Sequence, residues 1–401
     1  MIRMATRLIA SHSSLLLMAA GTGLFAVTNL ILGASMDAKD FGVYGLVATL
    51  VSVQATFGFM GLDHAAMRLA EKEGGSHSVN ARIVHALPVA GIVSAAALAG
   101  FALYSTGSAS VAVVVMIASL GISGTVVVGQ AFRLKREYSS AQFSLNFWRF
   151  LFFAVAMLSV LRKADLNFLL FGLTASIAVA GSTSIFAGLR LKGHLHVRPG
   201  SGNALGYCSS YFASLLLVTA LSTADRFIVA DLVGPEVFGR YFFNYSLAAV
   251  PFSLLASYSG FRELGEFKLD PSRSRYARAL RRNALGAVLF AFVLLGGIWS
   301  ALLLVPSSLE GKIDAGLIGL FLLLGVSKVI YSVVSAGMGA VGSNRSIWAA
   351  NAWSAAMLVF AVAFVYLFNA DMYVIVMAVM ALWLARIVVC SAYIRGQIHD
   401  V

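Results

Sequence analysis

The sequence has few charged residues for its length. Only 11% of its 401 residues are Asp, Glu, Lys or Arg, and 60% are hydrophobic. A soluble globular domain carries about 25% charged residues. No stretch is long and polar enough to form a soluble domain, whereas apolar runs of about 20 residues, the length that crosses a bilayer as a helix, recur along the whole chain. The sequence therefore predicts an all-α integral membrane protein.

Residues that carry chemistry are also scarce. The two cysteines, Cys208 and Cys390, lie far apart in or near apolar runs, so they give neither a disulfide framework nor metal-ligand spacing. Histidines show no ligand spacing beyond the pair His194 and His196. The chain contains no phosphate-binding glycine motif, no carboxylate pair and no nucleophile with a base. We therefore expect no cofactor, no metal and no enzymatic activity.

Twelve membrane spans are expected in two lobes of six, at residues 1–195 and 196–401. The first run continues to about residue 34, which is too long for a signal peptide. A linker with basic residues and several glycines, at 190–205, joins the lobes. The expected spans are 14–34, 41–60, 84–104, 110–131, 145–161, 167–189, 209–233, 238–260, 284–304, 315–338, 347–368 and 371–393.

Lysine and arginine are distributed unevenly between the two sides of these spans. Of the 29, 20 fall on the two termini and the loops after even-numbered spans, and 4 fall on the other loops. Because cytoplasmic loops are enriched in Lys and Arg, both termini are expected to be cytoplasmic. This bias accounts for most of the net charge of +12. The loop 261–283, with seven basic residues, fits the same role and attraction to anionic membrane lipids. No aromatic and basic surface accompanies the charge, so we expect no nucleic-acid partner.

Two short patterns indicate an internal duplication. The Phe-Gly-x-Tyr segment Phe41–Tyr44 recurs 197 positions later as Phe238–Tyr241, and the Asn-x-Trp pattern at Asn146 recurs 205 positions later at Asn351. Each copy holds an even number of crossings, so both begin on the same side. The halves are therefore expected to be related by a pseudo-twofold axis along the membrane normal.

Polar groups at membrane depth concentrate in the seventh span. An intramembrane charge such as Arg226 costs at least ~2.5–3.5 kcal/mol, so it is expected to face a partner or a wet cavity. Ser222, Thr223 and Arg226 are spaced to lie on one helix face. We interpret this stripe as part of a polar lumen in which Arg226 binds an anion, with Asp225 as the candidate site for a coupling ion. The alternative is a structural ion pair between helices.

Four other polar residues lie within or at the ends of spans. Lys328, near the middle of span ten, is either a charged lumen residue or a lysine kept neutral by desolvation. Arg386, in span twelve, is a further candidate for substrate binding, or extends toward the cytoplasm. Asn29 lies opposite Arg226 in the repeat and either lines the lumen or makes an interhelical hydrogen bond. Arg149, near an end of span five, is best interpreted as an interfacial anchor.

Several of these segments resemble a known family. Gly61-Leu62-Asp63 with Arg68 after span two, and Asp225–Ile228 followed by Phe238–Tyr241, in twelve spans of two halves, resemble the polysaccharide transporter family of the multidrug/oligosaccharidyl-lipid/polysaccharide exporter superfamily. The chain looks like an O-antigen or exopolysaccharide repeat-unit flippase. The resemblance covers nearly the whole chain, although its motifs are short.

The resemblance implies a V-shaped, two-lobed transporter that works by alternating access. Its substrate would be an undecaprenyl-diphosphate-linked oligosaccharide, moved across the bacterial cytoplasmic (inner) membrane for polysaccharide or lipopolysaccharide biosynthesis. Arg226 matches the family's charged motif, whereas Lys328 fits the cationic lumen by depth and charge. Implied partners are this lipid-linked substrate, membrane lipids, a polysaccharide polymerase and glycosyltransferases. The alternatives are a cation-coupled multidrug exporter, a peptidoglycan-precursor flippase, a membrane enzyme acting on glycolipids, and a non-transporting scaffold.

Overall fold

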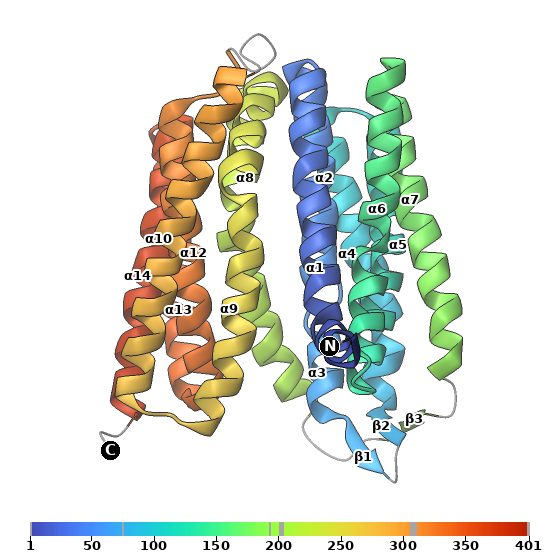
Figure 1. Cartoon of the computed structure of the whole chain (residues 1–401), viewed down its shortest axis with the longest axis vertical. Coiled ribbons are helices and arrows are strands. Elements are labelled where there is room, and N and C mark those ends of the chain that lie inside the picture. Colours follow the sequence, from blue (N-terminus) through green and yellow to red (C-terminus); the bar gives the residue numbers. More distant parts are fainter. Residues whose placement is uncertain (1, 74–75, 192–193, 200–203, 305–310, 399–401) are drawn as a thin grey trace. The chain divides into compact units, whose positions relative to one another are not determined.

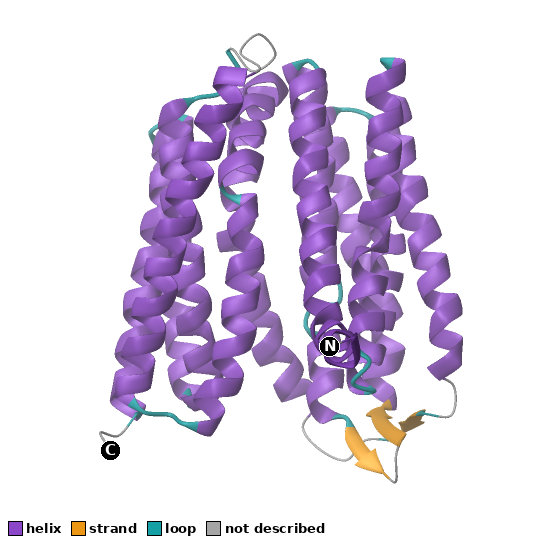
Figure 2. Ribbon diagram, in the orientation of Figure 1, coloured by secondary structure: helices purple, strands orange, loops and turns teal. Residues whose placement is uncertain are grey.

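The computed structural model describes residues 2–73, 76–191, 194–199, 204–304 and 311–398, and nearly all of them are helical (Figures 1 and 2). Among these residues, 11 helices are long and apolar enough to cross a membrane. One of them, α8, consists of two helices joined at a break. The expected span 238–260 covers the second helix of α8 and the beginning of α9, and each other expected span falls largely on one helix. The chain is therefore an all-α membrane protein with twelve spanning helices, as predicted.

The chain forms two compact units. Unit 1 comprises Met1–Thr28 and Val43–Thr219, and unit 2 comprises Asn29–Gly42 and Ala220–Val401. The helices α1 (Ile2–Ser35) and α2 (Ala38–Phe57) each contribute to both units. Unit 1 further holds α3 (Leu62–Leu69), α4 (Ala81–Thr106), α5 (Ala109–Leu134), α6 (Tyr138–Arg162), α7 (Leu166–Gly188) and the 3-10 turn Leu189–Leu191. The central helix of unit 1 is α5, which packs against α4, α6 and α7.

A small sheet at the α3 end of unit 1 was not predicted (Figure 2). It consists of β1 (Glu71–Glu73), β2 (Ser76–Asn80) and β3 (Leu195–Arg198). Strand β2 pairs antiparallel with β1 and parallel with β3. Because β3 belongs to the expected linker, hydrogen bonds to β2 attach that part of the linker to unit 1. Lys192 and residues 200–203 of the linker lie outside the described residues.

Unit 2 is built around α12 (Ala315–Val341), which packs against α9, α10 and α14. Its apolar face buries Phe321, Val333 and Val334 completely. The remaining elements of unit 2 are most of α8 (Ala204–Ala248), α9 (Val250–Leu269), α10 (Arg273–Leu304), α13 (Asn344–Leu367) and α14 (Met372–Gln397).

The break in α8 follows from a Gly-Pro pair. Gly234 has φ 78° and ψ 171°, a conformation that a residue with a Cβ strongly disfavours. Pro235 lacks an N–H and suits the first turn of the helix that follows. The chain therefore reverses at Gly234, and the two helices of α8 form a hairpin. Tyr241 Oη, on the second helix, donates to Asp225 Oδ2 on the first over 2.7 Å.

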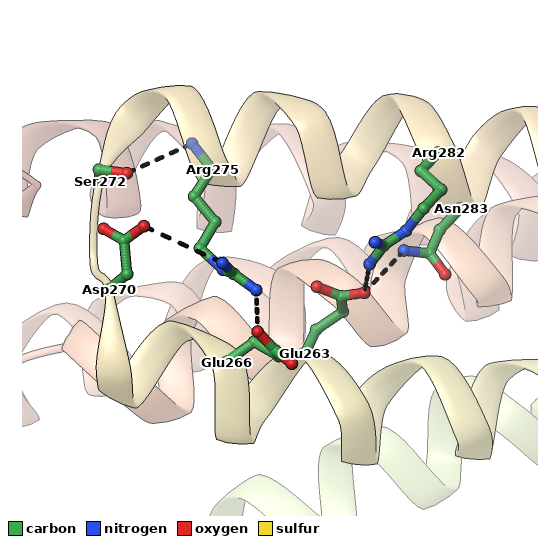
Figure 3. A network of polar contacts seen from close by, with 7 residues as sticks. All are labelled: Glu263, Glu266, Asp270, Ser272, Arg275, Arg282 and Asn283. Atoms are coloured by element: carbon green, nitrogen blue, oxygen red, sulfur yellow. Dashed lines mark hydrogen bonds and ion pairs between the residues drawn. The ribbon is translucent and has the colours of Figure 1, made fainter.

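The expected loop 261–283 is mostly helix. Helix α9 continues to Leu269 and α10 begins at Arg273 because Phe267, Tyr276 and Ala279 pack into a core with α12 and α14. Acidic residues of α9 hold the basic residues of α10 (Figure 3). Glu263, only 1% exposed, accepts from Arg282 Nη2 and Asn283 Nδ2, and Arg275 pairs with Glu266 and Asp270. Some of the basic residues of this segment thus stabilise the packing of α10 against α9.

The duplicated Phe-Gly-x-Tyr segments meet through their glycines. A Cβ added to Gly239 would lie 1.8 Å from the carbonyl oxygen of Ala38, and one added to Gly42 would lie 1.9 Å from that of Pro235. The repeat offset relates Ala38 to Pro235 and Gly42 to Gly239, so the contact is reciprocal. Glycine at both positions lets the backbones approach closely, as small residues do between membrane helices.

The compact units differ from the expected lobes in two segments. Residues 196–219 group with unit 1, where Phe212 packs against Phe57 with ring centroids 5.4 Å apart. Asn29–Gly42 group with unit 2, where Lys312 Nζ donates to the carbonyls of Gly33 at 2.8 Å and Ala34 at 2.7 Å. Tertiary contacts of this kind have no signature in the local sequence.

Candidate functional site

Asp225 and Arg226 lie on the first helix of α8, and both are buried, with 1% and 7% of their surfaces exposed. Arg226 Nε is 3.9 Å from Asp225 Oδ1, and neither atom makes a hydrogen bond with the described residues. Asp225 instead accepts a hydrogen bond from Tyr241, and Arg226 Nη2 donates to the carbonyl of Ser222. The ion pair is therefore loose, and a neutral group holds each charge.

Arg226 and Lys328 share one aromatic ring. Arg226 Cζ lies 4.6 Å from the centroid of the Tyr245 ring, and Lys328 Nζ lies 5.4 Å from it. Both distances are within the range of a cation–π contact. Tyr245 stands one turn after Tyr241 on the second helix of α8, and Lys328 projects from α12. The α8 hairpin and α12 thus bring together two of the three cations that the sequence predicted as site residues.

Arg386, on α14, forms a second cluster with Tyr331 of α12 and Asn351 of α13. Its Nε donates to Tyr331 Oη at 2.8 Å, and its Nη2 donates to Asn351 Oδ1 at 3.0 Å. Only 6% of Arg386 is exposed, so these two contacts hold its guanidinium inside unit 2. The Trp383 ring packs against Tyr331 at a centroid distance of 4.7 Å. Tyr331 is one turn from Lys328 on α12, so this helix carries Lys328 and also binds Arg386 of α14.

The positive charge in unit 2 exceeds the negative charge beside it. Among the described residues, a carboxylate approaches Arg226, whereas none pairs with Lys328 or Arg386. Aromatic rings and neutral acceptors stabilise these cations without neutralising them. The cluster is chemically suited to bind an anion.

The other predicted site residues take different places. Thr223 and Arg226 are buried on the same helical stripe, and Ser222 is half-buried beside them, as the spacing predicted. Asn29 is 1% exposed on the part of α1 that belongs to unit 2, where it has an interaction partner. Its role in a site remains a prediction.

Sequence reasoning missed the two tyrosines that organise the site. Tyr241 was recognised only as part of the repeated Phe-Gly-x-Tyr segment, and Tyr245 was not singled out. The expected spans 209–233 and 238–260 already imply a reversal near Gly234, and aligning them as a hairpin would have placed both tyrosines opposite Asp225 and Arg226. The hydroxyl of Tyr241 and the ring of Tyr245 are the groups that complement the two charges.

Arg149, which we expect to be an interfacial anchor, makes contacts within unit 1 that the sequence did not predict. Its Nη1 donates to Thr22 Oγ1 on α1 at 2.9 Å and to Asn146 Oδ1 at 2.8 Å. The Phe25 and Trp148 rings lie 5.6 and 5.4 Å from its Cζ atom. A polar group on the facing helix therefore keeps the guanidinium within unit 1.

Solved structures of transporters share this fold. The chain is similar to an inward-facing multidrug resistance MATE family transporter of the MOP superfamily, with a TM-score of 0.61 and 13% identity over 94% of this chain and 95% of that one. It is also similar to a MATE transporter in the bent conformation (TM-score 0.52, 14% identity, 96% and 94% covered) and to a eukaryotic MATE transporter (0.55, 10%, 98% and 95%). No protein-family profile and no curated protein sequence matches the chain.

Proposed function

We propose that this protein is an alternating-access flippase for an undecaprenyl-diphosphate-linked oligosaccharide repeat unit in the bacterial inner membrane, where it serves polysaccharide biosynthesis. The observation that carries the proposal is the pair Arg226 and Lys328 on the single Tyr245 ring. The fold of transporters supports the mode of action. The excess positive charge supports an anionic substrate.

A ligand with two phosphate groups matches the two cations better than a ligand with one negative charge does. At an effective dielectric constant near 20, opposite unit charges at 4 Å attract by roughly 4 kcal/mol. Two cations beside one ring can contact neighbouring phosphate groups, and Asp225 limits the attraction when no substrate is bound. Ser222, Thr223 and Asn29 are the proposed hydrogen-bonding groups for the glycan, and Arg386 is a further cation for the same substrate.

A cation-coupled multidrug exporter is the second candidate. The multidrug transporters of similar fold and the buried carboxylate Asp225 favour it. Arg226 and Lys328 disfavour a cationic drug at the same place, because like charges in a medium of low dielectric constant repel. A peptidoglycan-precursor flippase also carries a diphosphate, and the charge cluster suits it equally.

Ligand binding to the purified protein in lipid nanodiscs tests the proposal. Farnesyl diphosphate serves as the anionic probe and ethidium as the cationic one. We expect Arg226→Gln and Lys328→Gln each to weaken farnesyl diphosphate binding by about 10- to 100-fold, the loss of one charged hydrogen bond or ion pair. Arg240→Gln is the matched control, because Arg240 lies exposed on the same α8.

Ethidium binding that survives both substitutions, with no binding of farnesyl diphosphate, would favour the exporter and refute the flippase. In cells, loss of surface polysaccharide with Arg226→Gln, but not with Arg240→Gln, is the expected result. Equal polysaccharide in both strains at equal protein level in the membrane would contradict the proposed role of the cationic pair.

A further inference from the structure

Arg149 of unit 1 carries a charge that its surroundings do not neutralise. Both hydrogen bonds of its guanidinium run through Nη1, to the neutral acceptors Thr22 and Asn146. Nε is buried and has no acceptor, and Nη2 has none among the described residues. No described carboxylate pairs with this arginine. Because Nε and Nη2 form one edge of the guanidinium, two parallel donors on the same side lack an acceptor among the described residues.

The repeat relates this arrangement to the Arg386 cluster. Asn146 and Asn351 occupy equivalent positions in the two halves, and each accepts a hydrogen bond from an arginine. The two arginines differ in the edge that is occupied. Arg386 uses Nε and Nη2 for Tyr331 and Asn351, whereas Arg149 has no acceptor for this edge among the described residues. The arginine of unit 1 is therefore the better ligand for a planar oxyanion.

The helices α1 and α6 fix the position of Arg149. A Cβ on Gly21 would lie 2.6 Å from the Cβ of Asn146, so glycine permits the close approach that brings Thr22 to the guanidinium. The Trp148 ring, only 5% exposed, supports one side, and the half-buried Phe25 ring lies edge-on to it at 5.2 Å. Rigid neighbours reduce the entropy lost when a ligand binds.

We propose that Arg149 binds the carboxylate of an acidic sugar in the transported glycan, through its Nε–Nη2 edge. A carboxylate is planar and accepts two parallel hydrogen bonds from such an edge. The half-buried Phe25 ring and the amide of Gln142, which accepts from Asn146, supply apolar and polar surface for the sugar. The inference rests on the proposed function, because the sugar is part of that substrate.

Tryptophan fluorescence can report binding at this place. The chain has five tryptophans, and replacement of Trp299, Trp348, Trp353 and Trp383 by Phe leaves Trp148 beside the guanidinium. Titration of this full-length protein with sodium glucuronate is expected to give a saturable signal, whereas glucose at matched ionic strength gives none. In the same background, Arg149→Lys should weaken the response about tenfold or more, because an ammonium lacks the planar edge.

Two further variants separate binding from folding. Arg162→Gln changes an exposed arginine at the end of the same α6 and should bind as the parent does. Asn146→Asp places a carboxylate beside Arg149 Nη1, so it should abolish the glucuronate response, and the new ion pair with Arg149 offsets the lost donation to Gln142 and keeps the protein folded. A response unchanged in Arg149→Lys or in Asn146→Asp would overturn the assignment. Saturation by inorganic phosphate but not by glucuronate would also overturn it.

The two titrations distinguish a failure of the Arg149 site from a failure of the flippase proposal. If farnesyl diphosphate binding depends on Arg226 and Lys328 while glucuronate does not bind, only the Arg149 assignment fails. Glucuronate binding that depends on Arg149, without any farnesyl diphosphate binding, would support the acidic-sugar site and refute the diphosphate site.

Discussion

A methyl group at Gly239 tests the close backbone contact between the two Phe-Gly-x-Tyr segments. The Cβ of Gly239→Ala would lie 1.8 Å from the carbonyl oxygen of Ala38 and 3.1 Å from the backbone nitrogen of Gly42. Carbon and carbonyl oxygen normally approach no closer than about 3.3 Å. Both obstructing atoms belong to the backbone, so no side-chain rotation relieves the clash, and the helices must separate by more than an ångström.

The expected cost follows from these distances. Overpacking by a methylene costs about 1–3 kcal/mol where side chains can adjust, and here they cannot. The better helix propensity of alanine returns about 1 kcal/mol. With the cost at the upper end of that range, we expect a net destabilisation of ~2 kcal/mol, seen as a lower melting temperature of the detergent-solubilised protein by intrinsic fluorescence. Gly296→Ala is the control, because its added Cβ meets no atom within 4 Å.

A double-mutant cycle gives a second check. Once Gly239→Ala has separated the helices, Gly42→Ala should cost little more, because the two methyl groups strain one reciprocal contact. Melting temperatures of Gly239→Ala and Gly296→Ala that agree within error would refute the contact. Strictly additive effects of the two glycine substitutions would show that the two sites are independent.

Three other substitutions have defined outcomes. Lys312→Met should lower the melting temperature by several degrees, because it leaves the Gly33 and Ala34 carbonyls without their donor, and exposed Lys163→Met should not. Burial lowers the pKa of Lys312, whereas the nearby charge of Asp37 raises it. Its Nζ donates to three carbonyl oxygens, an arrangement that suits the charged ammonium form. Glu263→Gln should destabilise by about 1–3 kcal/mol through its charged bond to Arg282, measured against exposed Glu236→Gln. Asp225→Asn, which removes the negative charge beside Arg226, should tighten farnesyl diphosphate binding severalfold in the nanodisc titration, and weaker binding would contradict the electrostatic argument.

The sequence predicts the positions of the membrane spans well but says little about which helices pack against one another. Apolar length alone located the twelve helices, because a bilayer demands continuous apolar runs with internally satisfied backbones. The same rule placed the end of span eight near residue 260, yet α9 continues to Leu269. Beyond the membrane, helix length depends on packing of residues such as Phe267 against other helices.

The candidate site was predictable in its charges but not in its contacts. Arg226 and Lys328 stood out because a cation inside an apolar run is costly. The shared Tyr245 ring depends on the placement of α12, because Lys328 lies far from Tyr245 in the sequence. For Arg149, proximity to the end of a span suggested an anchor, and its contact with Thr22, 127 positions away, could not be read from local spacing.

The close contact at Gly239 and the charges of the site belong to one segment. Gly239 precedes Tyr241 by two residues and Tyr245 by six, on the second helix of α8. A displacement of this helix from Ala38 must therefore move the hydroxyl that holds Asp225 and the ring that both cations share. We expect Gly239→Ala to weaken farnesyl diphosphate binding as well as stability, whereas Gly296→Ala changes neither. A variant that melts early but binds the probe normally below its melting temperature would show that the tyrosines keep their positions without the glycine contact.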